Sequence, residues 1–154
     1  MNVWTGIGRI GYWLTWPLLW VYLRDSHRTR LVLINDTGKL LVVRGWVADS
    51  SRWSLPGGGL HRGEEPQHGL LREVHEEVGL TLAPDKLRLL KEMPVHIKGF
   101  HFYVHIFMAT ITGEPTLHLQ RFEITDAQWI DYHTLNEKNA ESDLLLALVG
   151  LPVV

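Results

Sequence analysis

Three glutamates stand close together in Glu65–Leu80, which reads EPQHGLLREVHEEVGL. If this stretch is helical, each residue turns by about 100° around the axis, so Glu76 and Glu77 lie within roughly 60° of Glu73. Like charges on one helical face destabilise a helix by about a few tenths of a kcal/mol per pair. A bound Mg²⁺ reverses that effect, because it takes oxygen ligands and works beside substrate phosphates. The three carboxylates therefore predict a metal site.

The neighbouring residues fit a helix that presents these carboxylates. Pro66 suits the first helical turn, where its missing N–H costs nothing, and Gly79 suits the helix end. A second face carries aliphatic residues that we expect in the core, Leu71, Val74 and Val78. Upstream, the glycines at 57–59 let the backbone approach a ligand closely. A glycine turn before a carboxylate helix predicts a site for metal and phosphate.

The spacing of these residues matches a known motif. Gly58 is followed by five residues and Glu64, then by seven residues and REVHEEVGL at 72–80. This resembles, at every defined position, the Nudix box G-x5-E-x7-R-E-U-x-E-E-x-G-U of the Nudix hydrolase family, in which U is a bulky aliphatic residue. So many specified positions make a chance match improbable. WSLPGG before the box also resembles the family. The motif covers about residues 53–80 and the strand pattern about 30–132.

The resemblance implies roles for the box residues. Glu73, Glu76 and Glu77 would bind Mg²⁺, or alternatively Mn²⁺, together with a backbone carbonyl of Gly57 or Gly58. Glu76 or Glu77 would also orient or deprotonate the attacking water. The implied fold is an α/β/α sandwich with a mixed β-sheet. The implied reaction is hydrolysis of a pyrophosphate bond in a nucleoside diphosphate linked to another moiety.

Residues around the metal ligands also receive expected roles from this resemblance. Arg72 would ion-pair with a neighbouring box glutamate and hold it in its ligating rotamer, and Glu64 would brace the loop against the helix. A further acid or base often lies outside the box in this family. Glu123, in RFEITDAQWI, is our candidate, with Glu114 and Asp126 as rivals.

The rest of the chain predicts a mixed α/β domain, because strands are interspersed with a few helices. Apolar runs at 31–35 and 40–44 flank turn residues and predict a hairpin. Further strands are expected at 86–93, 100–111 and 127–132. In the longest of them Phe100, Phe102, Val104, Ile106 and Met108 fall on one face. A closing helix is expected at 142–149, with Ser142 as its N-cap.

Length and composition limit the class of protein. The 154 residues suit one domain, and 45% hydrophobic with 21% charged residues is typical of a globular chain. The absence of cysteine excludes disulfides and cysteine nucleophiles and fits a reducing compartment, so we expect a cytoplasmic protein. A net charge of −2 predicts no nucleic-acid partner.

The first 25 residues stand apart from this domain, which we expect to span 26–154. Residues 10–23 are nearly all apolar, with three tryptophans and Pro17. This segment is too short for a membrane span, which needs about 20 apolar residues, and no signal cleavage site follows it. We expect a Trp-rich arm or helix that packs on the domain or on a second subunit in a homodimer. Contact with a membrane surface is the weaker alternative.

The substrate is less well determined than the reaction. His96, His101 and His105 form no zinc spacing, and we expect a polar sheet face or part of the substrate pocket. Pro94 lies fourteen residues after Leu80, near but off the position that marks ADP-ribose enzymes of the family. We therefore expect a nucleoside triphosphate or a similar small nucleotide. The alternatives are an ADP-ribose or nucleotide-sugar pyrophosphatase and, in another class, a non-catalytic nucleotide-binding Nudix regulator.

Overall fold

A computed structural model describes residues 26–45, 51–97, 100–120 and 123–149, and of 96–97 and 100–101 it describes only the backbone. The expected arm at 1–25 lies outside these residues. The strands are β1 (Ser26–Asn35), β2 (Lys39–Gly45), β3 (Arg88–Ile97), β4 (Phe100–Ile111) and β5 (Ile124–Asp131). The helices are α2 (Pro66–Val78) and α3 (Ser142–Leu148), with 3-10 turns η1 (Pro84–Lys86) and η2 (Tyr132–Thr134). None of the helices in these ranges is long and apolar enough to cross a membrane.

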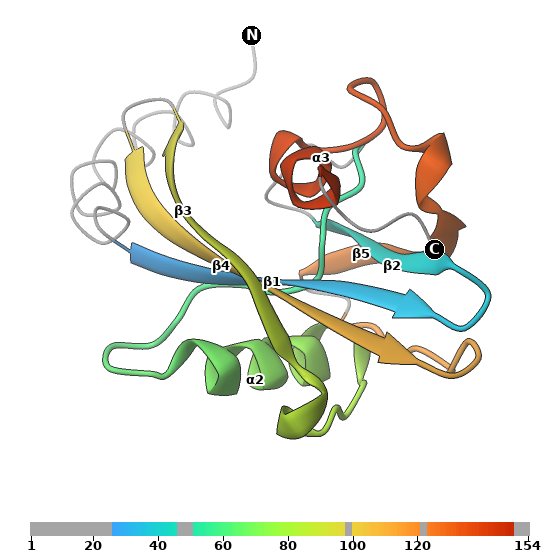
Figure 1. Cartoon of the computed structure of the whole chain (residues 1–154), viewed down its shortest axis with the longest axis horizontal. Coiled ribbons are helices and arrows are strands. Elements are labelled where there is room, and N and C mark those ends of the chain that lie inside the picture. Colours follow the sequence, from blue (N-terminus) through green and yellow to red (C-terminus); the bar gives the residue numbers. More distant parts are fainter. Residues whose placement is uncertain (1–25, 46–50, 98–99, 121–122, 150–154) are drawn as a thin grey trace, which may run out of the picture.

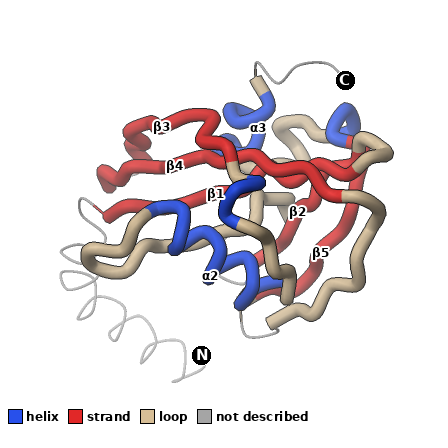
Figure 2. The backbone as a smooth tube through the Cα atoms, turned by 60° about the horizontal axis from the view of Figure 1, so that its bottom comes forward, coloured by secondary structure: helices blue, strands red, loops and turns tan. Residues whose placement is uncertain are grey.

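The strands form one mixed sheet in the order β3-β4-β1-β2-β5. β1 runs parallel to β4, and the other neighbours are antiparallel. Figure 1 shows α2 below the sheet and α3 above it, and the turned view in Figure 2 agrees. The expected α/β/α sandwich with a mixed sheet is therefore confirmed.

Both faces of the central strands are buried, because a helix covers each face. Leu31 and Leu33 of β1 pack with α2, whereas Val32 and Ile34 pack on the opposite face with Leu144 of α3. This explains why the strands read as continuous apolar runs rather than as alternating patterns. In β4 the expected face is present: Val104 and Ile106 are buried in the α3-side core, and Phe102 and Met108 pack against it.

The segment between β2 and α2 lies beside the amino half of β1. Leu31 N donates to Pro56 O and Thr29 N donates to Gly58 O, both at 2.9 Å. Ser54 bridges to Val43 of β2, so this segment fills the space between the two strands. Figure 2 shows the following loop running along β1 before it enters α2. This path places the glycine turn between the sheet and the carboxylate helix.

Several local expectations are confirmed and four are corrected. The strand expected at 127–132 is β5, which begins at Ile124 and ends at Asp131 because Tyr132 belongs to η2. The hairpin and the helix after Glu65 form where the sequence indicated. β3 begins at Arg88 rather than Lys86, because η1 occupies residues 84–86, and it continues to Ile97. The N-cap of α3 is Glu141, so the prediction of Ser142 was wrong by one residue. In α2 the residue fully buried with Val74 and Val78 is Leu70 rather than Leu71, because i, i+4, i+8 spacing turns Leu70 toward the sheet.

Candidate active site

Both ends of α2 are set by local sequence. The Glu65 side chain accepts a hydrogen bond from His68 N, and Pro66 occupies the first turn. Gly79 ends the helix in the left-handed region at φ 73°, where its N–H bonds His75 O. The segment at 117–120 then runs along this end, because His118 N donates to Val78 O and Gln120 N donates to Glu77 O. The helix that carries the carboxylates is therefore fixed at both ends.

Arg72 lies at the centre of an ion-pair network. Its Nε and Nη2 each contact one carboxylate oxygen of Glu64 at 2.9 Å. Nη1 donates to Glu73 at 2.9 Å and to Glu76 at 3.1 Å, and Nη2 also donates to Gly59 O. The Arg72 guanidinium holds the pKa of Glu64 down at about 2. The structure thus places Glu64 between the loop and the helix and fixes the rotamers of two box glutamates.

Glu77 is the most buried of the box carboxylates, with 7% of the residue exposed. Its Oε2 accepts a hydrogen bond from Gly57 N at 2.8 Å. Burial raises the pKa of Glu77 to about 7, and burial also raises the pKa of Glu73. The negative charge of Glu123 contributes to both of these raised pKa values, so Glu123 lies near the pair. Glu73 is therefore partly and Glu77 almost fully removed from water, whereas Glu123 is exposed and adds only its charge.

The rivals of Glu123 lie in other surroundings. Glu114 pairs with Lys39 Nζ at 2.6 Å, at the start of β2. Asp126 accepts a hydrogen bond from Gln128 and lies opposite Arg44 in the β2–β5 pairing. Glu76 is the exposed member of the box, and it lines a hollow of about 510 Å³ with residues 117–120.

The carbonyls of the glycine turn point to three different donors. Gly57 O accepts from Arg30 Nη1, Gly58 O from Thr29 N, and Gly59 O from Arg72. Gly57 has φ 127°, and a Cβ at this position would collide with the backbone carbonyl of Thr29. Only glycine fits there, because L side chains rarely adopt this backbone conformation.

The donor set suits a hard cation, although the side chains are turned to protein partners. Among the described residues no three acids or histidines already converge on a common metal position, since Glu77 faces Gly57 N and Arg72 holds Glu73 and Glu76. Glu77 is buried and Glu73 is partly buried, and the charge of Glu73 adds to the raised pKa of Glu77. A divalent cation with oxygen ligands would relieve that repulsion, so the residues present fit Mg²⁺ or Mn²⁺.

The histidine at position 105 belongs to a separate network. His105 Nδ1 bonds Glu92 at 2.8 Å and its Nε2 lies 3.1 Å from His27 Nδ1. His27 also stacks on Tyr103. The side chains of His96 and His101 lie outside the description. No hydrogen bond in the described residues joins the His105 network to the box carboxylates.

Sequence reasoning missed Arg30 and a cleft beside it. Arg30 is the last charged residue before the apolar half of β1, and an arginine at the edge of that apolar run was the signal available in the sequence. It contacts the glycine turn and, at 3.3 Å, Asp143 of α3. A cleft of about 260 Å³ lies between β3, β4 and α3, and Asp143 also lines it. The remaining lining residues are Met93, Pro94, Val95, Val104, Ile106, Ser142 and Leu146.

Comparisons with known proteins agree with this geometry. The family model of the Nudix domain matches residues 25–148. The chain therefore belongs to the Nudix family of hydrolases. It is 43% identical over 56 residues to a MutT-like protein of Streptomyces ambofaciens, covering 36% of this chain and 35% of that protein. The chain spans less than half the length of each of the first curated relatives that it matches.

Solved structures share the fold. A MutT Nudix hydrolase from Burkholderia pseudomallei superposes with a TM-score of 0.70 at 21% identity, covering 82% of this chain and 97% of that chain. The Nudix domain of NrtR from Shewanella oneidensis, solved with ADP-ribose, superposes with a TM-score of 0.68 at 18% identity, covering 79% and 82%. Similarity at these identities supports the fold alone.

Proposed function

We propose that this chain is a Mg²⁺-dependent pyrophosphohydrolase acting on a nucleoside diphosphate linked to another moiety. The observation that carries the proposal is Glu77, a buried carboxylate held by the Gly57 N–H beside Glu73 and Glu123. A carboxyl group with a strongly raised pKa, grouped with others at a glycine turn, is typical of a functional site rather than of a structural helix.

The proposed metal ligands are Glu73, Glu76, Glu77 and the backbone carbonyl of Gly58. Mg²⁺ at this place would neutralise phosphate oxygens and lower the pKa of a bound water. Arg72 would keep Glu73 and Glu76 together until they bind the ion, since it already contacts both. Glu64 would anchor Arg72 itself through its two-pronged ion pair.

In the proposed reaction one water molecule hydrolyses one phosphoanhydride bond. A water oxygen forms a bond to one phosphorus, and the bond from that phosphorus to the bridging oxygen breaks. The bridging oxygen leaves on the other phosphate, and the water proton is accepted by Glu76 or Glu77, with Glu123 as the additional acid or base. Positioning and charge stabilisation contribute most in such phosphoryl transfers, so the carboxylates that α2 and Arg72 hold in place are the important protein groups.

For the substrate we propose a nucleoside triphosphate or a similar small nucleotide. The cleft of about 260 Å³ has a mainly apolar lining and lies beside the Asp143–Arg30 pair. Pockets for drug-sized ligands usually enclose about 300–1,000 Å³, so this cleft favours one ring system over two nucleosides. ADP-ribose or a nucleotide sugar is the alternative, supported by the ADP-ribose complex of the similar NrtR domain. A non-catalytic regulator is the third candidate, and the complete set of box carboxylates disfavours it.

The test is a hydrolysis screen of nucleoside triphosphates, ADP-ribose and nucleotide sugars with Mg²⁺, Mn²⁺ or chelator, in which the nucleotide products are separated by chromatography. Glu77→Gln removes the buried charge at nearly constant shape, and we expect turnover to fall about a thousandfold or more, because a metal ligand is lost. Glu114→Gln is the matched control, since Glu114 pairs with Lys39 away from the box. If no substrate gives metal-dependent turnover in the wild type, the enzyme proposal fails. Tight nucleotide binding without turnover would favour the regulator.

A further inference from the structure

Arg30 joins three parts of the molecule that are far apart in the sequence. It lies on β1, its Nη1 donates to Gly57 O of the glycine turn, and its Nε donates to Asp143 Oδ2 of α3 at 3.3 Å. The side chain is 14% exposed, so the guanidinium is held mostly away from water. Figure 1 shows β1 running between the layers of α2 and α3.

The charges around Arg30 are those of a binding site rather than of a simple surface ion pair. Its positive charge lowers the pKa of Glu77, so the guanidinium lies near the box carboxylates. A second arginine, Arg28, shares the same face of β1. The negative charges of Asp143 and Glu141, at the start of α3, act on Arg28 and raise its pKa, although burial lowers that pKa by more. Of these two arginines, Arg30 is the one that acts both on Glu77 of α2 and on Asp143 of α3.

Arg30 has donors that the described residues do not use. A guanidinium has five N–H groups, and the bonds to described residues engage only Nη1 and Nε. The contact to Asp143 is long for a charged hydrogen bond, which is usually about 2.7–2.9 Å. A phosphate accepts two parallel N–H bonds from an arginine, so it can compete well for this side chain.

The position of Arg30 also fits the path of a substrate. Asp143, its partner, lines the apolar cleft between β3, β4 and α3, whereas Gly57, its other partner, bonds Glu77 through its own N–H. A nucleotide whose base occupies the cleft must lead its phosphates past Arg30 to reach the carboxylates. Phosphates entering a region rich in acids need a cation there besides the metal.

We propose that Arg30 binds a substrate phosphate on the α3 side of the glycine turn, exchanging its contact with Asp143 for phosphate oxygens. This inference rests on the proposed function and names a binding residue for it outside the Nudix box. It also assigns Asp143 a role: its carboxylate competes with the phosphate for the same guanidinium.

The metal ion and the phosphate carry opposite charges, so removal of the Arg30 charge should affect their binding in different ways. A cation that binds near Glu77 is repelled by Arg30, whereas a phosphate is attracted. Arg30→Gln should therefore leave the affinity for Mn²⁺ alone unchanged or increased. The same variant should weaken binding of inorganic pyrophosphate in the presence of Mg²⁺ between about tenfold and a hundredfold, the range of a lost charged hydrogen bond. Both affinities are measured by titration calorimetry on the full chain.

Arg28→Gln is the matched control, because it removes the same charge from the same face of β1. The Arg28 guanidinium lies over the Phe102 ring, and only the Arg28 backbone, not its side chain, pairs with Gly59 of the glycine turn among the described contacts. We therefore expect the effect of Arg28→Gln on pyrophosphate binding to stay below about threefold. Asp143→Asn should tighten pyrophosphate binding, because it removes the competing anion. Arg30→Lys should lie between wild type and Arg30→Gln, since a lysine keeps the charge but not the paired donors.

Four results would overturn the inference. One is an equal loss of Mn²⁺ and pyrophosphate binding in Arg30→Gln, which would indicate only a structural role. Another is no loss of pyrophosphate binding, and a third is an equal loss in Arg28→Gln, which would indicate a diffuse field. The fourth result applies if Arg30→Gln does not fold: it is pyrophosphate binding by Asp143→Asn that is unchanged or weaker than in the wild type. If the wild type bound no Mn²⁺, or if its Mn²⁺ binding did not depend on Glu77, the proposed function itself would instead be overturned.

Discussion

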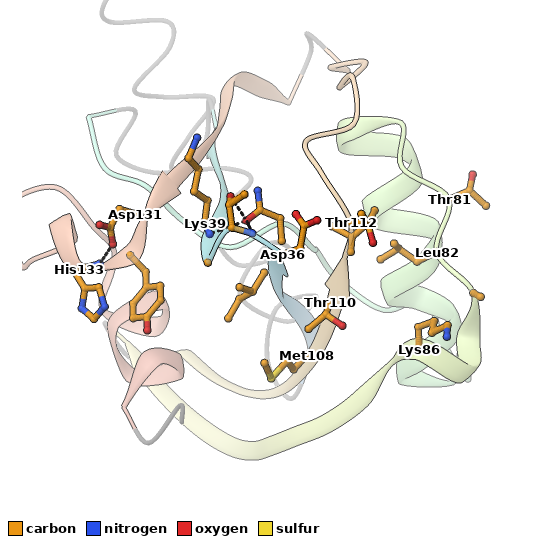
Figure 3. A pocket seen from close by; sticks show the side chains of 17 residues that line it. Asp36, Lys39, Thr81, Leu82, Lys86, Met108, Thr110, Thr112, Asp131 and His133 are labelled. Carbon is orange, nitrogen blue, oxygen red and sulfur yellow. Dashed lines mark hydrogen bonds between the residues drawn. The ribbon is translucent and has the colours of Figure 1, made fainter. Parts of the chain in front are cut away.

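The two ends of β1 differ in a way that shows where chemistry is located. The larger cavity, about 1090 Å³, lies at the carboxyl end, beside the β1–β2 turn and the ends of β4 and β5. Figure 3 shows Asp36, Lys39, Thr110 and Asp131 around this open region. The amino half of β1 borders the glycine turn instead, where the space is smaller but the acids are buried.

Several polar groups at the cavity end hydrogen-bond one another, although Asn35 Nδ2 is buried without a partner among the described residues. Asn35 Oδ1 accepts from Thr37 N, Thr37 Oγ1 and Lys39 N, and Asp131 accepts from His133 N. These are ordinary turn interactions. At the glycine turn, Glu77 is buried, and the charge of the partly buried Glu73 adds to the rise of its pKa. Charge that lacks compensation, rather than volume, therefore distinguishes the candidate active site.

The largest expected effect compares one glycine from each end. Gly57→Ala should lower the free energy of unfolding by about 3 kcal/mol or more, because a Cβ meets the Thr29 carbonyl and φ is 127°. Gly38→Ala, at φ 78° with nothing near its Cβ, should cost about 1–2 kcal/mol. Urea unfolding measures both variants. Equal losses would show that the glycine turn is no more crowded than the hairpin.

The second prediction concerns the cost of the buried charge at Glu77. Its folded pKa of about 7 lies above its ordinary value of 4.5, so the folded state binds more protons than the unfolded state between these values. Without metal, stability therefore falls as the pH rises from 4.5 to 7, and the full cost remains above 7. Glu77→Gln should stabilise the metal-free protein at pH 8 by roughly 1–3 kcal/mol.

Thermal unfolding in chelator at pH 8 and pH 4.5 tests this sign. The gain from Glu77→Gln should shrink at the lower pH, where the wild-type carboxyl is protonated. Added Mg²⁺ should stabilise wild type more than the variant, because a ligand that binds only the folded state raises its stability. A variant less stable than wild type in chelator at pH 8 would contradict the prediction.

The third prediction concerns the Glu64–Arg72 pair. Arg72 lowers the pKa of Glu64 to about 2, so the pair stabilises the fold above the ordinary carboxyl pKa. This contribution is lost as the pH falls toward 2. Arg72→Gln should cost about 1 kcal/mol at pH 7, and the cost should shrink on acidification. Chemical unfolding between pH 7 and pH 2 measures it, with Lys39→Gln, which breaks the exposed pair with Glu114, as the control.

The smallest effect is expected at the cavity end. Thr110→Val and Lys86→Gln change side chains that line the large cavity. Neither residue is bonded to the box, so kcat/KM should stay within about twofold of wild type. A loss comparable with that of Glu77→Gln would place substrate binding in the large cavity and reverse the comparison between the two ends.

How much of the site could be predicted depends on how far apart its residues lie in the sequence. Glu73, Glu76 and Glu77 lie within one turn of a helix, so spacing alone placed them on one face. The neighbourhood of Glu123 was different. Sequence spacing could not separate it from Glu114 or Asp126, because only the docking of residues 117–120 on the end of α2 brings it near Glu77.

The sequence by itself determined the family, the helix and the carboxylate face, because these depend on local periodicity and on a motif of fixed spacing. The tertiary structure decided that Arg30 reaches both Gly57 and Asp143, which are 27 and 113 residues away. It also decided that Glu77, rather than Glu76, is buried against the glycine turn. Burial and long-range contacts follow from how the layers pack, and packing is not encoded in the spacing of any one segment.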